Sequence, residues 1–276
     1  MVNAALHARK ARRGFQLAVI AAWIAFHPLP AAAQLVISPL RQILTRDATA
    51  ATYQISNPSD RIVDARISWV DLAATGTGYK PANPAEREKL SAAPYLVLSP
   101  SRLRIEPGKR AEVTIRLKKG ARIPAGERRS HLLIETTPVR TPLRRAGGGL
   151  EVDVGLGITT PVILRSGLAA PETAFENTRL LRDVDGLLEI QTTVTRNGRY
   201  SSFGRLVASL NIDGKSDIVA EADNVAIHAD AEDKKVTLPI KIDTLPPGEL
   251  TLSYLGAGEY DGTLFAEKKF EIAPAQ

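Results

Sequence analysis

The sequence predicts an all-β protein with two antiparallel β-sandwich domains behind a removable leader. From Gln34 onward, short runs of alternating apolar and polar residues are separated by turn residues, which is typical of antiparallel sandwiches. No sustained 3.6-residue apolar period occurs in this part of the chain, so few helices are expected. About 240 residues follow the leader, which is enough for two hydrophobic cores.

The leader has the three parts of an export signal. It carries four bases and no acids, at Arg9, Lys10, Arg12 and Arg13. The apolar run Leu17–Phe26 is shorter than the roughly 20 residues of a membrane-spanning helix. A small-residue segment ending at Ala33 resembles a cleavage site. We therefore expect export and cleavage after Ala33, giving a signal peptide over residues 1–33. An uncleaved membrane anchor is the alternative.

Charge and cysteine content exclude several functions. The whole chain has a net charge of +6, and removing the four bases of the leader lowers it to +2. Such a nearly neutral protein gives no reason to expect a nucleic-acid or anionic-membrane partner. Cysteine is absent, so neither disulfides nor thiolate chemistry are available.

The first predicted domain covers residues 34–165. Its expected strands are Leu35–Ile37 with Ile43–Leu44, Tyr53–Ser56, Ile62–Val70, Tyr95–Ser99, Leu103–Ile105, Arg110–Leu117, His131–Thr136 and Leu150–Ile158. Trp69, in the middle of one of these strands, is expected to pack in the core. Residues 73–93 are rich in glycine, proline, alanine and charge, and predict a long connection with a helical turn over Glu86–Leu90.

The second predicted domain covers residues 166–276. The small residues, glycine and proline of Ser166–Pro171 predict a linker between the domains. The expected strands after it are Leu187–Thr195, Phe203–Ile212, Ile218–Ile227, Val236–Ile242, Glu249–Tyr254 and Leu264–Ile272.

One strand has the cleanest alternation in the chain, and it follows a basic, glycine-rich segment, Pro138–Gly149. One of its faces is entirely apolar, with Leu150, Val152, Val154, Leu156 and Ile158. The other face carries Glu151, Asp153, Gly155 and Gly157. Such a strand can be added to the sheet of another chain, or it can turn its apolar face into its own core. Composition alone favours the second interpretation.

Residues that could carry catalysis are scarce. After the leader there are two histidines, His131 and His228, and neither has a further ligand at metal-binding spacing. Ser130 and His131 are neighbours on a predicted strand, so their side chains point to opposite faces and cannot form a nucleophile–base pair with each other. We therefore predict no enzyme activity, no catalytic residue, no metal and no cofactor. A hydrolase or sugar-binding sandwich has no residue that supports it.

The first domain resembles the periplasmic pilus (fimbrial) chaperones in the order of several motifs. These motifs are Leu40-Arg41-Gln42-Ile43, Val97-Leu98-Ser99-Pro100, Leu103-Arg104-Ile105-Glu106-Pro107-Gly108, Val113-Thr114-Ile115-Arg116, Glu127-Arg128-Arg129-Ser130 and Ile134-Glu135-Thr136-Thr137-Pro138. They occur in the family's order across residues 34–165 and precede its flexible loop and long alternating strand. The second domain carries no such motif.

The resemblance implies two immunoglobulin-like sandwiches in an L shape, located in a Gram-negative periplasm. It implies donor-strand complementation, in which the chaperone lends a strand to a pilus subunit that lacks one. The client-binding residues would be Arg41, Leu150, Val152, Val154, Leu156 and Ile158. Pilus subunits and an outer-membrane usher are the implied partners. An exposed apolar strand would also favour self-association of the free protein.

One departure from the family concerns the end of the alternating strand. The family has a lysine there which, with the first-strand arginine, anchors the client's C-terminal carboxylate. The segment Ile158–Arg165 contains no lysine, although Arg165 is placed like the family's terminal arginine. Arg41 is then the only matched base, and we expect it to be a solvated charge whose removal leaves the melting temperature unchanged. The departure favours the alternative function, an exported accessory or structural protein of surface assembly that donates no strand.

Overall fold

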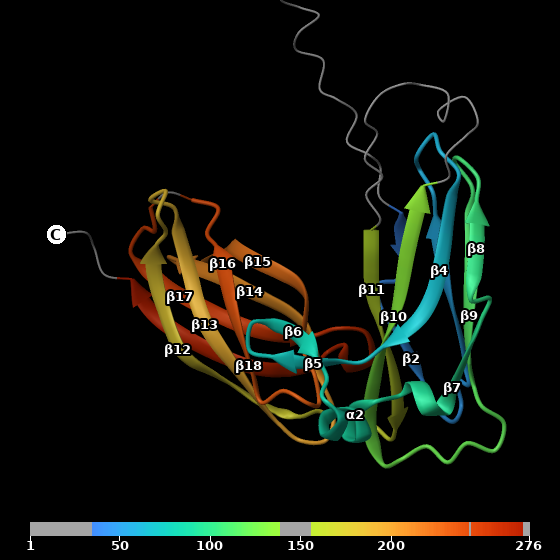
Figure 1. Ribbon diagram of the computed structural model, residues 1–276. Helices are drawn as coiled ribbons and strands as arrows, with labels where there is room; N and C mark the ends of the chain where they lie inside the picture. The colour runs from blue at the N-terminus through green and yellow to red at the C-terminus, as the bar shows by residue number, and fades with distance from the viewer. Residues whose placement is uncertain (1–34, 139–155, 243, 273–276) are drawn as a thin grey trace, which may run out of the picture.

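The computed structural model describes residues 35–138, 156–242 and 244–272. They form two β-sandwiches that meet at one end of each and diverge from there, which gives the molecule an L-like shape (Figure 1). Residues 167–171 connect the last strand of the first sandwich to the first strand of the second. The all-β class and the two-sandwich architecture predicted from the sequence are confirmed.

The first sandwich packs a four-stranded sheet against a five-stranded one. The smaller sheet has the order β1 (Val36–Ser38), β3 (Ala50–Ser56), β9 (Arg110–Leu117), β7 (Leu96–Ser99). The larger sheet has the order β2 (Gln42–Leu44), β11 (Leu156–Ser166), β10 (Gly126–Pro138), β4 (Val63–Val70), β8 (Arg102–Ile105). All neighbouring strands are antiparallel except β11 and β2, which are parallel.

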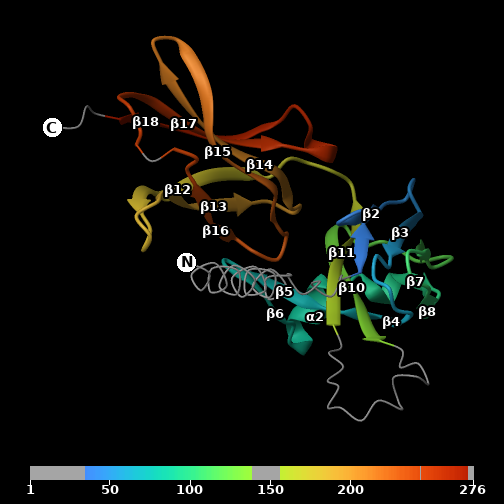
Figure 2. The same ribbon diagram turned by 90° about the horizontal axis from the view of Figure 1, so that it is seen from above.

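The second sandwich packs a three-stranded sheet against a four-stranded one, and Figure 2 shows the two layers. The smaller sheet has the order β12 (Glu172–Arg182), β13 (Leu188–Asn197), β16 (Asp233–Pro239). The larger sheet has the order β15 (Lys215–Ile227), β14 (Ser202–Ile212), β17 (Gly248–Gly256), β18 (Leu264–Ile272). A short 3₁₀ turn, η2 (Gly258–Tyr260), lies between β17 and β18.

The segment between β4 and β7 is more structured than the sequence predicted. It contains a hairpin of β5 (Leu72–Thr75) and β6 (Gly78–Pro81), then α2 (Pro84–Leu90) and the 3₁₀ turn η1 (Ala93–Tyr95). The helix begins with a capping box, in which Asn83 and Glu86 each accept a hydrogen bond at 2.9 Å from the other's backbone N–H. The predicted helical turn is therefore confirmed, and it is one part of a larger insertion.

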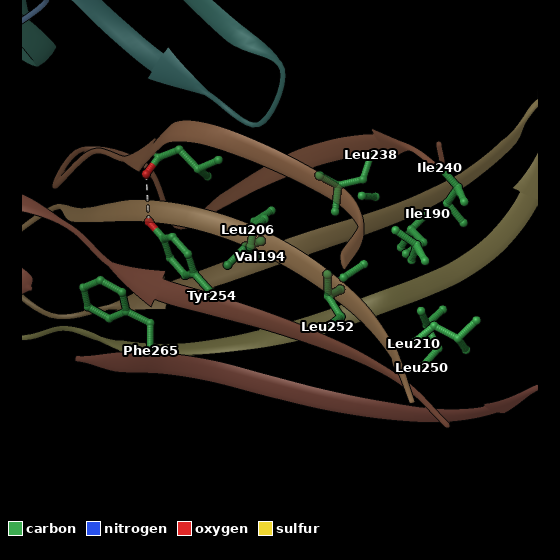
Figure 3. Packing of buried hydrophobic residues seen from close by; sticks show 14 of the residues in the cluster. Ile190, Val194, Leu206, Leu210, Leu238, Ile240, Leu250, Leu252, Tyr254 and Phe265 are labelled. Atoms are coloured by element: carbon green, nitrogen blue, oxygen red, sulfur yellow. Dashed lines mark hydrogen bonds between the residues drawn. The ribbon is translucent and has the colours of Figure 1, made fainter. Parts of the chain in front are cut away.

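Each sandwich has its own core. In the first, Tyr53, Ile55, Leu132 and Ile134 are fully buried, and Trp69 packs against this cluster as predicted. In the second, the facing sheets contribute the aliphatic side chains seen in Figure 3. There the buried Tyr254 hydroxyl donates a hydrogen bond of 3.0 Å to a backbone oxygen of β15. Full burial of each large apolar side chain contributes about 1.5–3 kcal/mol.

Two elements, the strand β12 and the β5–β6 hairpin, were not predicted from the sequence. Strand β12 lies at a sheet edge and its residues are mostly polar, with a register shift next to Asn177. The β5–β6 hairpin is rich in small residues, and it packs partly on the second domain through Ala74 and partly on α2 through Ala73. Alternation weakens where neither face of a strand meets its own core. Within the described residues, no helix has the length and apolar character needed to cross a bilayer.

Candidate functional site

The two halves of β11 have different surroundings. In the second half, Val162 to Leu164 pair with β10 on one side and with β2 on the other. The four side chains from Val162 to Arg165 are at most 2% exposed. This half is therefore a fixed inner strand of the sheet.

The first half of β11 lies at an open edge of the sheet. Residues 156–161 pair with β10, and among the described residues no strand pairs with them on the other side. Ile158 lies opposite the buried Ile134, so it points toward the inner face of the sandwich. Leu156 shares that face and is 38% exposed. Among the described residues, nothing covers the backbone edge here, and Leu156 on the inward face is partly exposed.

Two of the five apolar residues predicted to bind a client are described, and they lie on one face as the alternation required. Leu156 and Ile158 follow one another along the inward side of β11. The other three, Leu150, Val152 and Val154, lie outside the described residues, as does the segment 139–149. The predicted continuation of the strand toward residue 150 therefore stays a prediction.

Arg41 lies just before β2, and its guanidinium is held by the second domain. Its Nη1 and Nη2 atoms donate to the two carboxylate oxygens of Glu259 at 3.1 and 2.6 Å. The guanidinium carbon lies 3.3 Å from the ring centre of Phe203, so a cation–π contact adds to the ion pair. The side chain is only 17% exposed. The expectation that Arg41 is a solvated edge charge is therefore wrong.

A second arginine extends this contact into a four-residue ion network. Arg165 donates to Glu127 Oε2 from Nε at 3.0 Å and from Nη2 at 2.7 Å. Its Nη1 donates to Glu259 Oε1 at 2.9 Å, so Glu259 binds both arginines. Two arginines, Arg41 and Arg165, and two glutamates, Glu127 and Glu259, therefore neutralise one another's charge where the domains meet. We call these four residues the interdomain ion network.

The pKa values within this network follow from burial and pairing. Burial alone would raise the pKa of Glu259, but hydrogen bonds from Arg41 and the charge of Arg165 lower it below its ordinary value. Burial alone would lower the pKa of Arg165, and its two glutamate partners raise it instead. Glu259 and Arg165 are therefore both charged at neutral pH, and the charge of each stabilises the charge of the other.

Sequence reasoning did not foresee this network. Glu127 belonged to a recognised motif without a role, and Glu259 was one of several acids on turns that are usually solvated. Only Arg165 could be singled out from the sequence, because it is placed like the terminal arginine of the family's strand. The contacts span 38 residues to Glu127 and 94 to Glu259, so local patterns could not reveal them.

The residues considered for catalysis are separated as predicted. Ser130 Oγ accepts hydrogen bonds from the backbone N–H groups of Ala92 and Ala93 and donates to Asp71 at 2.5 Å. His131 points to the other face of β10 and meets the ring of Tyr79. Within the described residues, no group of three His, Cys, Asp or Glu side chains is arranged to hold a metal ion.

Comparison with known proteins gives matches among solved structures. No family model matches the sequence, and no curated protein does. The YadV chaperone is 13% identical, with 87% of this chain and 100% of that chain covered at a TM-score of 0.45. The SafB chaperone of Salmonella enterica, in complex with SafA pilin, is 16% identical, with 88% and 99% covered at 0.45. The periplasmic chaperone SfaE is 13% identical, with 86% and 98% covered at 0.41. The chain is thus similar in fold to several solved chaperones, one of them in complex with a pilin.

Proposed function

We propose that this chain is an exported, non-enzymatic chaperone that binds pilus subunits in the periplasm and lends them a β-strand. The observation that carries the proposal is the open edge of β11 between residues 156 and 159, with Leu156 and Ile158 on its apolar side. The ordered motifs of the first domain support the same function. A pilin is the partner named for SafB, and we propose that class of client here.

The mechanism we propose uses both features of this edge. An incomplete sandwich exposes unpaired backbone groups and an apolar groove, which makes it prone to aggregation. The free backbone edge of β11 would supply the missing hydrogen bonds, and alternate side chains would fill the groove. We propose that Leu150, Val152 and Val154 continue the row that Leu156 and Ile158 begin. Each buried apolar Å² contributes about 25 cal/mol, so five such side chains contribute several kcal/mol.

A pair of neighbouring substitutions tests the proposal. Ile158→Glu places a charge on the apolar face, whereas Thr159→Glu places the same charge on the exposed opposite face. Each variant is co-expressed with subunit-like proteins from the same organism, and the periplasmic complex is purified. We expect Ile158→Glu to abolish co-purification and Thr159→Glu to retain it. Thermal melts of the free variants provide the control for folding.

Two results would contradict strand lending. One is a normal complex with Ile158→Glu, and the other is equal loss with both variants. Because the same edge also favours self-association of the free protein, sedimentation of wild type and Ile158→Glu should accompany the test. A more monomeric Ile158→Glu protein is the expected result.

A second candidate function is favoured by the state of Arg41. Its guanidinium fork is filled by Glu259, and the segment 158–165 has no lysine. An exported accessory protein of surface assembly that donates no strand would need neither base for a client.

We propose instead that Arg41 takes part in client capture after exchanging Glu259 for a client carboxylate, and that an outer-membrane usher receives the complex. Glu259→Gln, which weakens the internal competitor, should then strengthen client binding. Unchanged binding would exclude the exchange at Arg41, and a failure of both proteins to bind any pilus subunit would favour the accessory function.

A further inference from the structure

The β5–β6 hairpin leaves the first sandwich and binds the second. The Ala74 N–H donates to Asp230 Oδ2 at 2.8 Å, and the Lys235 N–H donates to the backbone oxygen of Gly76 at 2.7 Å. Ala74 also packs against the core of the second sandwich. Figures 1 and 2 together show the hairpin lying beside the second domain on its β16 side. We call these contacts the hairpin contact.

Two buried histidines, one from each domain, both contact Tyr79 of this hairpin. His131 on β10 is 2% exposed and His228 after β15 is 7% exposed. The Tyr79 hydroxyl lies 2.6 Å from His228 Nε2, and the Tyr79 ring meets the His131 ring edge-on with centres 5.1 Å apart. Neither nitrogen of His131 has a hydrogen-bond partner within the described residues, and the same holds for Nδ1 of His228.

The charged groups around the two histidines would not stabilise a positive charge on either imidazole. Arg129 on β10 and Asp230 after β15 form an ion pair at 3.0 Å, and Asp230 also accepts the Ala74 N–H. The Arg129 guanidinium lies over the Tyr79 ring at 5.4 Å. Lys234 on β16 adds a further positive charge and donates to the backbone oxygen of Ala226. Of the acids described near the two histidines, Asp230 is thus already used by Arg129, and Asp233 lines the same small cavity without a hydrogen bond to either imidazole.

We propose that His131, His228 and Tyr79 form an acid-sensitive latch between the two domains. With both imidazoles neutral, the latch keeps the hairpin on the second domain. A proton on either imidazole would be a buried charge without a partner beside Arg129, and solvation of that charge requires the hairpin to separate from the second domain. The latch concerns the angle between the domains and is independent of the strand-lending edge.

The direction of the pH effect follows from the two states. Burial, followed by the charge of Arg129, lowers the pKa of His131 to about 3 and holds the pKa of His228 well below its ordinary value. In the open state both pKa values return to roughly 6.5. The stabilisation by the latch is therefore complete above about pH 6.5 and is lost as the pH falls below it. At pH 5 the opening constant rises about 30-fold per histidine over its value at pH 7.5, and roughly a thousandfold for both.

Hydrogen exchange of the mature chain between pH 7.5 and 5.0 tests the latch, because most carboxylates stay ionised in this range. After correction for intrinsic exchange, the amides of Ala74 and Lys235 should show a roughly thousandfold larger opening constant at pH 5.0. His131→Phe keeps a ring against Tyr79 and removes one titrating group without removing a hydrogen bond. His228→Gln removes the other. Each single variant should respond about 30-fold, and the double variant should hardly respond.

Amides of β9 in the first core separate latch opening from global unfolding, and they should keep their protection at pH 5.0. Equal acceleration of the β9 amides would overturn the proposal, as would an unchanged opening constant in wild type. So would an acid response that persists in both single variants at the full wild-type size. A titration of the imidazole proton resonances in folded wild type gives an independent measurement. A pKa near 6.5 for both histidines would also exclude the latch.

Discussion

The two halves of β11 share one backbone and one partner strand, yet they have different roles. Val162 to Arg165 are enclosed by β2, β10 and the second domain. Leu156 to Thr159 have β10 on one side only and are largely solvent-exposed. The enclosed half fixes the position and direction of the strand. The open half can therefore stay exposed for a binding partner, although it contributes little to the core. A strand can therefore be rigidly oriented and still be available for binding.

The largest expected effect is the loss of Arg165 from the enclosed half. Arg165→Met leaves Glu127, whose side chain is 1% exposed, without its cation. Removing one partner of a buried ion pair costs about 3–5 kcal/mol. Urea denaturation at pH 7 should show this loss in the free energy of unfolding. A loss below about 1 kcal/mol would mean that the interdomain ion network contributes little to stability.

The two halves are compared most directly by the same substitution in each. Leu164→Ala in the buried half should lower the free energy of unfolding by about 2–5 kcal/mol, because it leaves a cavity in the first core. Leu156→Ala in the open half should cost less than about 1 kcal/mol, since its side chain is already partly solvated. Equal losses would show that the open end is packed as firmly as the enclosed one.

Arg41→Ala should lower the free energy of unfolding less than Arg165→Met or Leu164→Ala, by an amount that is still measurable. It removes two hydrogen bonds to Glu259 from a partly exposed site, with an expected loss of about 1 kcal/mol. The lowered pKa of Glu259 adds a pH test. The contribution of this pair is complete above about pH 4.5 and is lost as the pH falls below it. The difference in melting temperature between Arg41→Ala and wild type should therefore shrink toward pH 3, and a constant difference would exclude the ion pair as its cause.

The sequence predicted the strands that have a buried face, and it failed where burial depends on another domain. Alternation identified β9, β13, β14 and β17, whose inner residues reach their own core. The sequence predicted a long connection where the β5–β6 hairpin lies. Part of the surface that this hairpin packs on is supplied by residues about 150 positions later in the chain. Apolar alternation identifies a strand only when the same face is buried along its whole length.

The candidate site divides in the same way. The inward row of Leu156 and Ile158 follows from a period of two, so the sequence alone placed both side chains on one face. The state of Arg41 depends on Glu259, which is 218 residues away, and on the ring of Phe203. Motif matching assigned Arg41 a position in the first strand but gave no information about its ion-pair partner.

The hairpin contact also sets an order for completing the fold as an exported chain arrives N-terminus first. Ala74 arrives 156 residues before Asp230, to which it is hydrogen bonded in the finished protein. The strands of the first sandwich, through Ser166, are available well before β15 and β16 exist. During this interval the hairpin has no surface to bind, and the Gly76 carbonyl and Ala74 amide are left to water. A chain that stops short of β16 thus retains an uncovered hairpin, a local and protease-accessible mark of incomplete synthesis.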